Sequence, residues 1–258
     1  MSARRSRGRP KPSGVHVVPG ERAVLELLDA APERVRRILL ARDLPAVEAA
    51  AVRAGVALER VDVDRLRTTA PEVEARGVLA LADPPPVHAL DALVELTLAA
   101  PGPRRLLVAL DGIEDPQNVG AIARSCEFFG VSGMFWSRDR GCPITPAVTR
   151  ASAGATERLV LGEVGNLADA LRRCKDAGLW VVGTVVDGGE SVHAVVRDGR
   201  LPDALVLVLG SEGAGLRRLT REHCDFLLTL PRRGSLGSLN VSAAAAAVLA
   251  LLTASATR

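Results

Sequence analysis

The fold class of this chain is decided by residues 205–215, Leu-Val-Leu-Val-Leu-Gly-Ser-Glu-Gly-Ala-Gly. The first five residues are a continuous apolar run, without the apolar-polar alternation of a strand that has one face in water. Such a run is typical of a parallel strand that helices cover on both faces. The glycine-rich part that follows indicates a sharp turn or a close approach to a ligand. The stretch therefore predicts an α/β fold with a polar loop at the carboxyl end of a buried strand.

Similar apolar segments recur on both sides of this strand and alternate with helical patterns. We expect strands at 106–110, 133–136, 160–161, 180–185, 205–209 and 226–230, and helices at 118–129, 167–177 and 239–254. This alternation predicts a parallel-sheet domain over residues 104–258. The glycine spacing is GxxGxG and not GxGxxG, and the Lys-Ser/Thr pair of a P-loop is missing. An NAD-type oxidoreductase, which the alternation alone would permit, is therefore disfavoured.

A smaller α/β unit is expected ahead of it, over residues 14–100. Its pattern predicts strands at 36–41, 56–61 and 77–82 and helices at 45–54, 63–69 and 89–99. The sequence Pro101-Gly102-Pro103 marks the boundary between the units. Residues 1–13 hold five cations and no acid, which predicts a flexible basic tail. That tail is either a solvated end or an arm that binds phosphate.

Composition narrows the class of protein further. Hydrophobic residues make up 48% and charged residues 24%, a profile typical of a globular chain. No apolar run reaches the ~18 residues that cross a membrane, and no apolar segment follows the N-terminal arginines. We therefore expect a cytoplasmic protein that does not contact membranes. The four cysteines lie far apart without a CxxC pair, so neither a metal site nor a disulfide framework is predicted.

Charge and aromatic content indicate which kind of ligand the chain can bind. The net charge of +3 permits an anionic ligand, although the many arginines can also reflect a GC-rich genome. Four Phe, two Trp and no Tyr leave little material for the stacking platforms of single-strand binders. If RNA is the partner, we expect arginine side chains and backbone groups to hold it.

Three loops at the expected carboxyl ends of strands carry the candidate site, because ligands of open α/β sheets bind there. The first, residues 111–124, starts a helix with Asp115 as its cap and Pro116 in its first turn. Capping does not explain Asn118, Gly120 and Arg124 in the same loop and helix, although an ordinary helix start with a surface arginine remains an alternative.

The second loop is the glycine-rich segment 210–215, for which a plain tight turn is the alternative. The third, residues 230–242, combines Gly234, Gly237 and Ser238 with two candidate caps, Asn240 and Ser242. One helix needs only one cap, so the second polar residue points to a site.

These loops carry a resemblance when they are taken in order. The segments are DPQNVGAIARS (115–125), SAGATERL (152–159), LGSEGAGL (209–216), LTREHCD (219–225) and SLNVSAAAA (238–246). Together they resemble the three signature motifs of the SpoU, or TrmH-type, RNA 2'-O-ribose methyltransferases. The resemblance covers residues 105 to about 253. The N-terminal half is similar to the domain, like ribosomal protein L30e, that binds substrate in this family.

The resemblance implies a knotted fold, a cofactor and partners. It implies a parallel sheet whose C-terminal segment forms a trefoil knot, S-adenosylmethionine bound in that knot, and a homodimer with sites near the subunit interface. It implies RNA and not DNA as substrate. Within the family the chain most resembles the bacterial enzymes that methylate a guanosine of 23S rRNA. A tRNA methyltransferase, an antibiotic-resistance rRNA methylase and a non-catalytic RNA-binding adaptor are the alternatives.

Positions that match the family's motifs supply the candidate site residues. Those implied for the donor are Gly183, Thr184, Gly210, Leu230, Ser238 and Leu239, and those implied for catalysis are Asn118, Arg124, Glu212, Asn240 and Ser242. Asn118 and Glu212 would orient Arg124 and the donor, and Asn240 and Ser242 would hold the ribose or the donor. None of the four histidines is assigned to catalysis, and no metal is implied.

Two roles are open for Arg124. A ribose hydroxyl attacks only as its proton leaves, and the family's favoured base is this arginine. A guanidinium, with a reference pKa above ~12, is a weak proton acceptor at neutral pH. Arg124 is therefore either the base or a donor that stabilises the emerging alkoxide and its phosphate.

Two positions depart from the family pattern. Arg22 stands where relatives usually show His in a Gly-x-His-Ala-Val opening, and Arg232-Arg233 is more basic than expected after Pro231. The first departure concerns the choice of RNA target, and the second offers a further phosphate contact.

Overall fold

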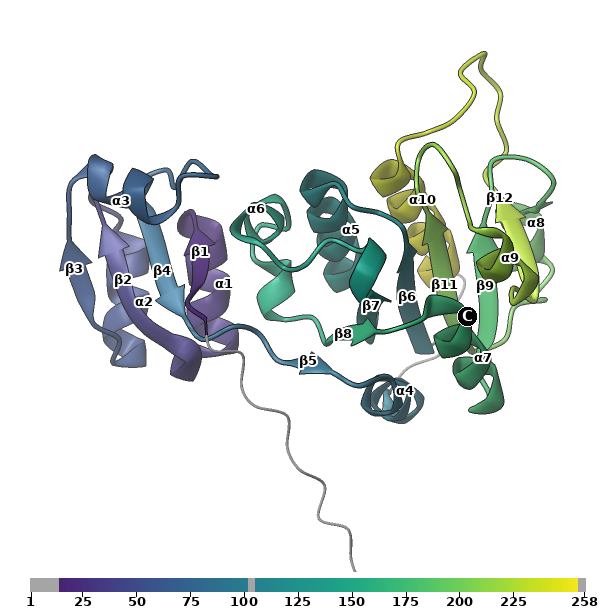
Figure 1. The fold of residues 1–258 in the computed structure, drawn as a ribbon, viewed down its shortest axis with the longest axis horizontal. Coiled ribbons are helices and arrows are strands. Elements are labelled where there is room, and N and C mark those ends of the chain that lie inside the picture. The colour runs from purple at the N-terminus through teal and green to yellow at the C-terminus, as the bar shows by residue number, and fades with distance from the viewer. Residues whose placement is uncertain (1–13, 102–104, 255–258) are drawn as a thin grey trace, which may run out of the picture.

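The chain folds into two α/β units, one built on each of two sheets, in a computed structural model that describes residues 14–101 and 105–254 (Figure 1). The smaller sheet has the strand order β1-β4-β2-β3, and the larger has the order β10-β12-β9-β11-β6-β7-β8-β5. The predicted basic tail, residues 1–13, lies outside the described residues.

The N-terminal unit is a mixed sheet with helices packed on it. Its elements are β1 (His16–Pro19), α1 (Glu21–Ala30), η1 (Pro32–Arg34), β2 (Val35–Leu40), α2 (Pro45–Ala54), β3 (Leu58–Arg60), α3 (Val63–Thr69) and β4 (Val78–Ala82). Strand β4 pairs antiparallel with β1 and β2, while β2 and β3 are parallel. The pattern predicted α2, α3 and three of these strands. It missed β1, a four-residue edge strand whose apolar run is too short to stand out.

The C-terminal unit begins at β5 (Val87–His88) and ends with α10 (Val241–Ala254). Between them lie α4 (Leu90–Ala99), β6 (Arg105–Asp111), α5 (Pro116–Phe128), β7 (Gly133–Ser137), η2 (Arg138–Arg140), α6 (Pro146–Ala151), η3 (Ala155–Glu157), β8 (Leu161–Val164), α7 (Leu167–Asp176), β9 (Trp180–Thr184), β10 (Glu190–Ser191), α8 (Val192–Arg197), β11 (Ala204–Gly210), α9 (Arg218–Glu222) and β12 (Phe226–Thr229). Every strand pairing in this sheet is parallel, as the sequence predicts.

Alternate residues of the central strands enter two different cores. Leu205, Leu207 and Leu209 of β11 pack in a cluster with residues of α5, α8 and α10. Val206 and Val208 pack on the opposite face with residues of α4 and α7. Both faces of the strand are buried, which explains why its sequence is continuously apolar.

The division between the units lies earlier than the sequence suggests. Strand β5 pairs with β8, and Leu90 and Leu93 of α4 are buried against the large sheet. Residues 87–99, which the sequence places in the N-terminal unit, thus pack with the C-terminal one. The physical reason is that the apolar side of α4 covers a sheet face that would otherwise face water. The crossing between the sheets is the proline-rich segment 83–86.

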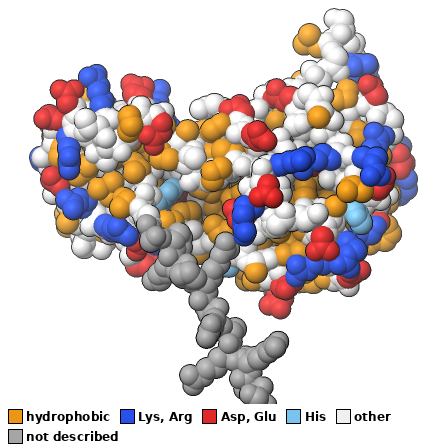
Figure 2. Space-filling view, in the orientation of Figure 1, with side chains coloured by type: hydrophobic (Ala, Val, Ile, Leu, Met, Phe, Trp, Pro, Cys, Tyr) orange, Lys and Arg blue, Asp and Glu red, His pale blue; other side chains and the backbone are white. Residues whose placement is uncertain are grey.

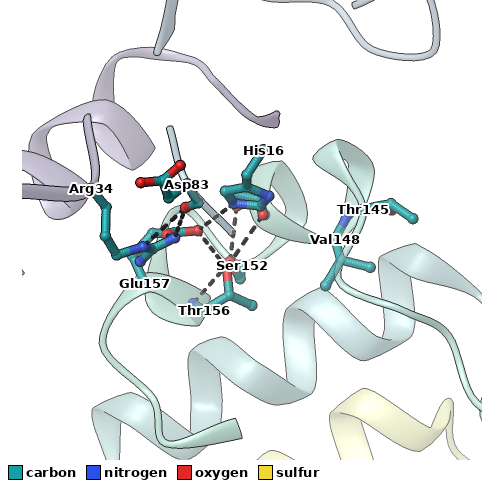
Figure 3. Close-up of polar contacts among 9 residues, drawn as sticks. His16, Arg34, Asp83, Thr145, Val148, Ser152, Thr156 and Glu157 are labelled. Atoms are coloured by element: carbon teal, nitrogen blue, oxygen red, sulfur yellow. Dashed lines mark hydrogen bonds and ion pairs between the residues drawn. The ribbon is translucent and has the colours of Figure 1, made fainter. Parts of the chain in front are cut away.

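A buried ion-pair network joins the units (Figure 3). His16 Nε2 of β1 lies 3.0 Å from Glu157 Oε1, and Arg34 Nη2 lies 2.9 Å from Glu157 Oε2. Arg34 also donates to the Asp83 carbonyl at 3.0 Å. Burial alone would raise the pKa of the Glu157 carboxyl, but His16 and Arg34 outweigh it and hold that pKa below its ordinary value. We call His16, Arg34 and Glu157 the junction network.

The end of the chain packs back on the beginning of the large unit. Helix α10 lies against α5, with Ala245, Val248 and Leu249 buried in the shared core. It begins at Val241 and not at Leu239, because Asn240 serves as its cap. The predicted knot stays a prediction. Among the described residues, no helix is both long and apolar enough to span a bilayer.

Candidate active site

The carboxyl ends of adjacent parallel strands form the platform of the candidate site. Asp111, the last residue of β6, stands in register with Gly210, the last residue of β11. On the other side of β11, Gly183 of β9 pairs with Val208, and Thr184 pairs with Leu228 of β12. The predicted donor residues Gly183, Thr184 and Gly210 therefore meet at one edge of the sheet.

Hydrogen bonds to the Glu212 side chain join three loops at the carboxyl ends of these strands. Its Oε1 accepts hydrogen bonds from Asn118 Nδ2 at 3.1 Å and from Asn240 Nδ2 at 2.5 Å. Asn240 Nδ2 also donates to Asn118 Oδ1 at 2.9 Å. These residues are 94 and 28 positions from Glu212 in the chain, so only the fold brings them together. We call Asn118, Glu212 and Asn240 the polar triad.

Ser242 joins the polar triad through the cap of α10. Asn240 Oδ1 accepts from the backbone N–H of Ser242 at 2.9 Å and from its hydroxyl at 2.5 Å. The same oxygen is thus both the helix cap and part of the site. At the start of α5, Asp115 accepts from the Gln117 N–H at 3.1 Å, which confirms the predicted cap and leaves the Asn118 side chain free to reach Glu212.

The glycine-rich loop turns back directly on the end of β11. The N–H of Gly215 donates to the Ser211 carbonyl at 2.9 Å, and Gly215 has a φ of +64°. A Cβ on Gly210 would lie 2.3 Å from the carbonyl carbon of Gly215, so no other residue fits there. This tight return projects Glu212 toward Asn118.

Asp111 anchors the far side of that loop, and the sequence analysis did not single it out. Its fully buried carboxylate accepts from the Arg217 N–H at 2.8 Å, and Arg217 Nε lies 3.3 Å from its other oxygen. A signal was present in the sequence, because the acidic Asp111 directly follows the apolar run 106–110 at the end of the strand. Asp111 and Arg217 together fix the loop that carries Glu212.

The remaining predicted donor residues lie in a more open region. Leu230 follows β12 and is half-buried against the main core. Ser238 and Leu239 lie in the exposed segment 231–240, which rises from the body of the unit (Figure 1). Arg232 Nη1 donates to the Gly237 carbonyl at 2.7 Å within this loop. Leu230, Ser238 and Leu239 thus belong to the connection that leads from β12 to Asn240 of the polar triad.

Arg124 does not join the polar triad. It lies six residues after Asn118 on α5, about 9 Å farther along the helix axis at 1.5 Å per residue. Its side chain lines a cleft of about 340 Å³ together with Arg22, Phe128 and Arg158. In the part of the chain that the structure describes, the Arg124 side chain has no hydrogen-bond or ion-pair partner.

Two glycines of the motifs have different physical roles. A Cβ on Gly120 would lie 2.4 Å from Ala151 Cβ and 2.8 Å from the Val148 carbonyl oxygen, so Gly120 allows α5 and α6 to pack closely. The close approach that its position predicts is therefore to a helix. A Cβ on Gly213 would meet no atom within 4 Å, so its side of the loop is open.

Other reactive side chains are structural. His16 lies in the junction network, far in sequence from the motifs. Cys126, Cys142 and Cys174 are buried, and burial raises the pKa of the Cys174 thiol to about 12. Within the described ranges, no group of three His, Cys, Asp or Glu side chains is placed to hold a metal ion.

Comparison with known proteins adds the family. The model of the SpoU rRNA Methylase family matches residues 105–250, more than half of the chain. The chain belongs to the SpoU rRNA methylase family. The chain is also similar to the 23S rRNA (guanosine-2'-O-)-methyltransferase RlmB of Pseudomonas putida, which is 38% identical over 87% of this chain and 90% of the relative. The RlmB protein of Escherichia coli is 34% identical over 87% of this chain and 92% of its own length.

A solved SpoU structure supports the same fold for both units. The SpoU methyltransferase AviRb from Streptomyces viridochromogenes, in complex with the cofactor AdoMet, matches with a TM-score of 0.73 and 25% identity. The match covers 94% of this chain and 90% of that one. The predicted α/β class and the parallel sheet of the SpoU fold are thus confirmed.

The carboxyl edge fits a cofactor that backbone groups hold. A Cβ on Gly183 would lie 2.6 Å from Leu216 and one on Gly210 would lie 2.3 Å from Gly215, so the chain itself encloses both strand ends. Gly213 faces open space, and segment 231–240 is exposed beside it, so these loops form the open part of the site. Such an edge presents peptide N–H and C=O groups to a ligand.

Proposed function

We propose that this chain transfers the methyl group of S-adenosylmethionine to the 2'-hydroxyl of a ribose in RNA, and that the target is a guanosine of 23S rRNA. The observation that carries the proposal is the meeting of three distant loops at Glu212, where Asn118 and Asn240 are hydrogen-bonded to it. Family membership and the RlmB relatives support the reaction and the target class.

The donor side would be the carboxyl edge of the large sheet. Gly183, Thr184, Gly210, Leu230, Ser238 and Leu239 would hold S-adenosylmethionine, mostly through their backbone groups. When bound, the sulfonium supplies a methyl group with a good leaving group. The residues of the polar triad would fix the glycine-rich loop and the start of α10 around the reacting atoms.

The acceptor side would be Arg124. As the ribose oxygen forms its bond to the methyl carbon, the carbon–sulfur bond would break to leave a neutral thioether, and the hydroxyl proton would pass to solvent water. Within residues 14–101 and 105–254, no side chain or carbonyl competes for the Arg124 guanidinium. We assign it to stabilising the developing alkoxide and the adjacent phosphate, because a guanidinium is a strong hydrogen-bond donor and a weak base.

A homodimer would bring the two sides together. In one copy Arg124 lies about 9 Å farther along α5 than Asn118, so Arg124 of a second copy would be a candidate for the acceptor side of the site. The alanine-rich helix α10, which lies beside α5, presents little side-chain volume and suits close packing of another backbone. The chain would act in the cytoplasm, where ribosomal RNA is found.

Transfer of labelled methyl groups from S-adenosylmethionine tests the activity directly. Purified protein should label 23S rRNA at one guanosine ribose and should not label tRNA. Arg124→Ala should lower transfer by about 100-fold or more while calorimetry finds donor affinity close to wild type. Exclusive labelling of tRNA would overturn the rRNA target, and absence of labelling on any RNA would overturn the reaction.

Mixing two inactive variants tests the shared site. If Arg124 and Asn240 of one site come from different copies, a mixture of Arg124→Ala and Asn240→Ala should regain activity. A mixture that stays inactive while subunits exchange would place both residues in one copy. Sedimentation of a fully active monomer would contradict the homodimer.

A further inference from the structure

Two adjoining clefts form a groove where the N-terminal and C-terminal units meet. One cleft, of about 340 Å³, contains Arg124, and the other, of about 300 Å³, lies nearer the N-terminal unit. They share Arg22 and Ala153, and the surface dips between the two units (Figure 2). We call the combined feature the junction groove; its arginines are Arg22, Arg42, Arg76, Arg124, Arg150 and Arg158.

The cleft nearer the N-terminal unit has a marked excess of positive charge. Four arginines line it, Arg22, Arg42, Arg76 and Arg150, against one acid, Glu21. The ion pairs of three of them are loose: 3.7 Å from Arg22 to Glu26, 3.6 Å from Arg42 to Glu21 and 3.8 Å from Arg76 to Glu74. Exposed pairs at such distances bind weakly, so these guanidinium groups remain available to an anion.

The backbone at this cleft is strained. Among the described residues, Arg76 and Ala153 are the two non-glycine positions with positive φ, at +50° and +53°. Both line the same cleft. A side chain in this left-handed region costs free energy, and such positions cluster at functional sites. The strain is thus concentrated where the arginines converge.

The two walls of the junction groove are held in a fixed relation. Arg22, Arg42 and Arg76 come from the N-terminal unit, and Arg124, Arg150 and Arg158 come from the C-terminal unit. Arg158 Nε donates to Glu26 Oε2 at 2.6 Å across the junction, and Arg150 contacts Glu74. Together with the buried junction network, these contacts keep the groove open without a ligand.

We propose that the junction groove holds the RNA backbone next to the methylated nucleotide, with Arg22, Arg42 and Arg76 on its phosphates and Arg124 at the catalytic end. This inference rests on the proposed function. Planar guanidinium groups suit phosphate oxygens, and no aromatic residue lines the four-arginine cleft, so its chemistry favours phosphates over stacked bases. Phe128, which is 78% exposed beside Arg124, offers one ring face at the end where a base would lie.

The test compares full-length wild type with the double variant Arg42→Gln/Arg76→Gln. Affinity for a 23S rRNA transcript is measured by fluorescence anisotropy over a range of salt concentrations. Each lost phosphate contact should reduce the log–log salt slope by about 0.7 to 0.9, so the double variant should bind about 30-fold more weakly at 0.1 M salt. The KM for RNA should rise while kcat stays close to wild type, because neither residue lies beside Arg124.

The matched control is Arg67→Gln/Arg197→Gln. It removes the same charge from two exposed arginines that do not line the groove. The salt slope of the control should stay close to wild type. Equal slopes and affinities for the control and the groove variant would overturn the proposal, because the effect would then be one of net charge.

Two further measurements separate other outcomes. If inorganic phosphate raises the Tm of wild type but not of the groove variant, while RNA affinity is equal in both, the groove is a small-anion site and the proposal is overturned. The salt dependence of RNA affinity is measured without catalysis, so it tests the role of the groove even if the protein transfers no methyl groups. A protein that transfers methyl groups but shows equal slopes would keep the proposed function and lose this inference.

Discussion

The junction between the two units uses charge in opposite ways on two adjacent surfaces. In the junction network, Glu157 is fully buried and its two oxygens are matched by His16 and Arg34 at 3.0 and 2.9 Å. In the junction groove, Arg22, Arg42 and Arg76 have ion pairs of 3.6 to 3.8 Å and line an open cleft. The first surface fixes how the units meet, and the second keeps its charge for a ligand.

Deleting the N-terminal unit should change stability and RNA binding more than any other change. The loss of stability should depend on where the chain is cut. A fragment of residues 85–258 keeps α4 on the sheet and should unfold cooperatively. A fragment of residues 102–258 lacks Leu90, Leu93 and Val94, whose burial covers Leu107 and Phe135. Losing three buried apolar side chains costs an amount comparable to the 5–15 kcal/mol stability of a whole domain, roughly 2–5 kcal/mol for each leucine.

Circular dichroism and dye binding distinguish the two fragments. The longer fragment should show a sharp thermal transition, and the shorter one should bind a hydrophobic dye without such a transition. Equal cooperative unfolding of both would show that α4 is not part of the C-terminal core. RNA affinity of the longer fragment should fall steeply, because Arg22, Arg42 and Arg76 are gone.

The sequence predicted much of this fold because its signals are local. The apolar runs at 205–209 and 106–110 mark buried strands, and Pro45 and Pro116 mark the first turns of helices that the structure confirms. The strong turn signal Pro101-Gly102-Pro103 placed the boundary between the units after α4. The pairing of β5 with β8, which assigns residues 87–99 to the C-terminal unit, joins residues more than seventy positions apart. No local pattern encodes such a contact.

The candidate site was predictable to a similar extent. The motifs pointed to Asn118, Glu212 and Asn240, which do meet. They also grouped Arg124 with them, whereas helix geometry carries it to the cleft at the junction. The junction groove could not be predicted from the sequence, because its arginines come from both units. They converge only when the junction network fixes how the units meet.

Replacing the carboxylate of the junction network should have the next largest effect. Glu157→Leu would leave His16 and Arg34 buried without their partner, which should lower the free energy of unfolding by about 3–5 kcal/mol. Urea unfolding measures the change. The matched control is Asp169→Leu, which breaks an exposed pair with Arg172 and should shift the midpoint little. Equal shifts in the two variants would show that the buried pair adds nothing to stability.

The same carboxylate should make stability depend on pH. The pKa of Glu157 is held below its ordinary value, so the charged form stabilises the folded state above the unfolded-state pKa, about 4.3. This contribution is lost as the pH falls through the lower folded-state pKa. The difference in unfolding free energy between wild type and Glu157→Gln should therefore narrow on acidification below about pH 4. A difference that stays constant into strong acid would mean that Glu157 is not ionised in the folded protein.

The smallest expected effect concerns the strained arginine of the junction groove. Arg76→Gly removes a side chain from a backbone with φ of +50°, which relieves steric cost but loosens the unfolded chain. The balance should be a gain in stability of up to about 1 kcal/mol. Because Arg76 lines the four-arginine cleft, the same change should weaken RNA binding. Ala153→Gly, at φ of +53°, relieves similar strain without removing a charge and should gain stability while keeping the salt slope of RNA binding. If Arg76→Gly lowers stability, the arginine contributes to folding, and the groove would then hold structural charge like the junction network beside it.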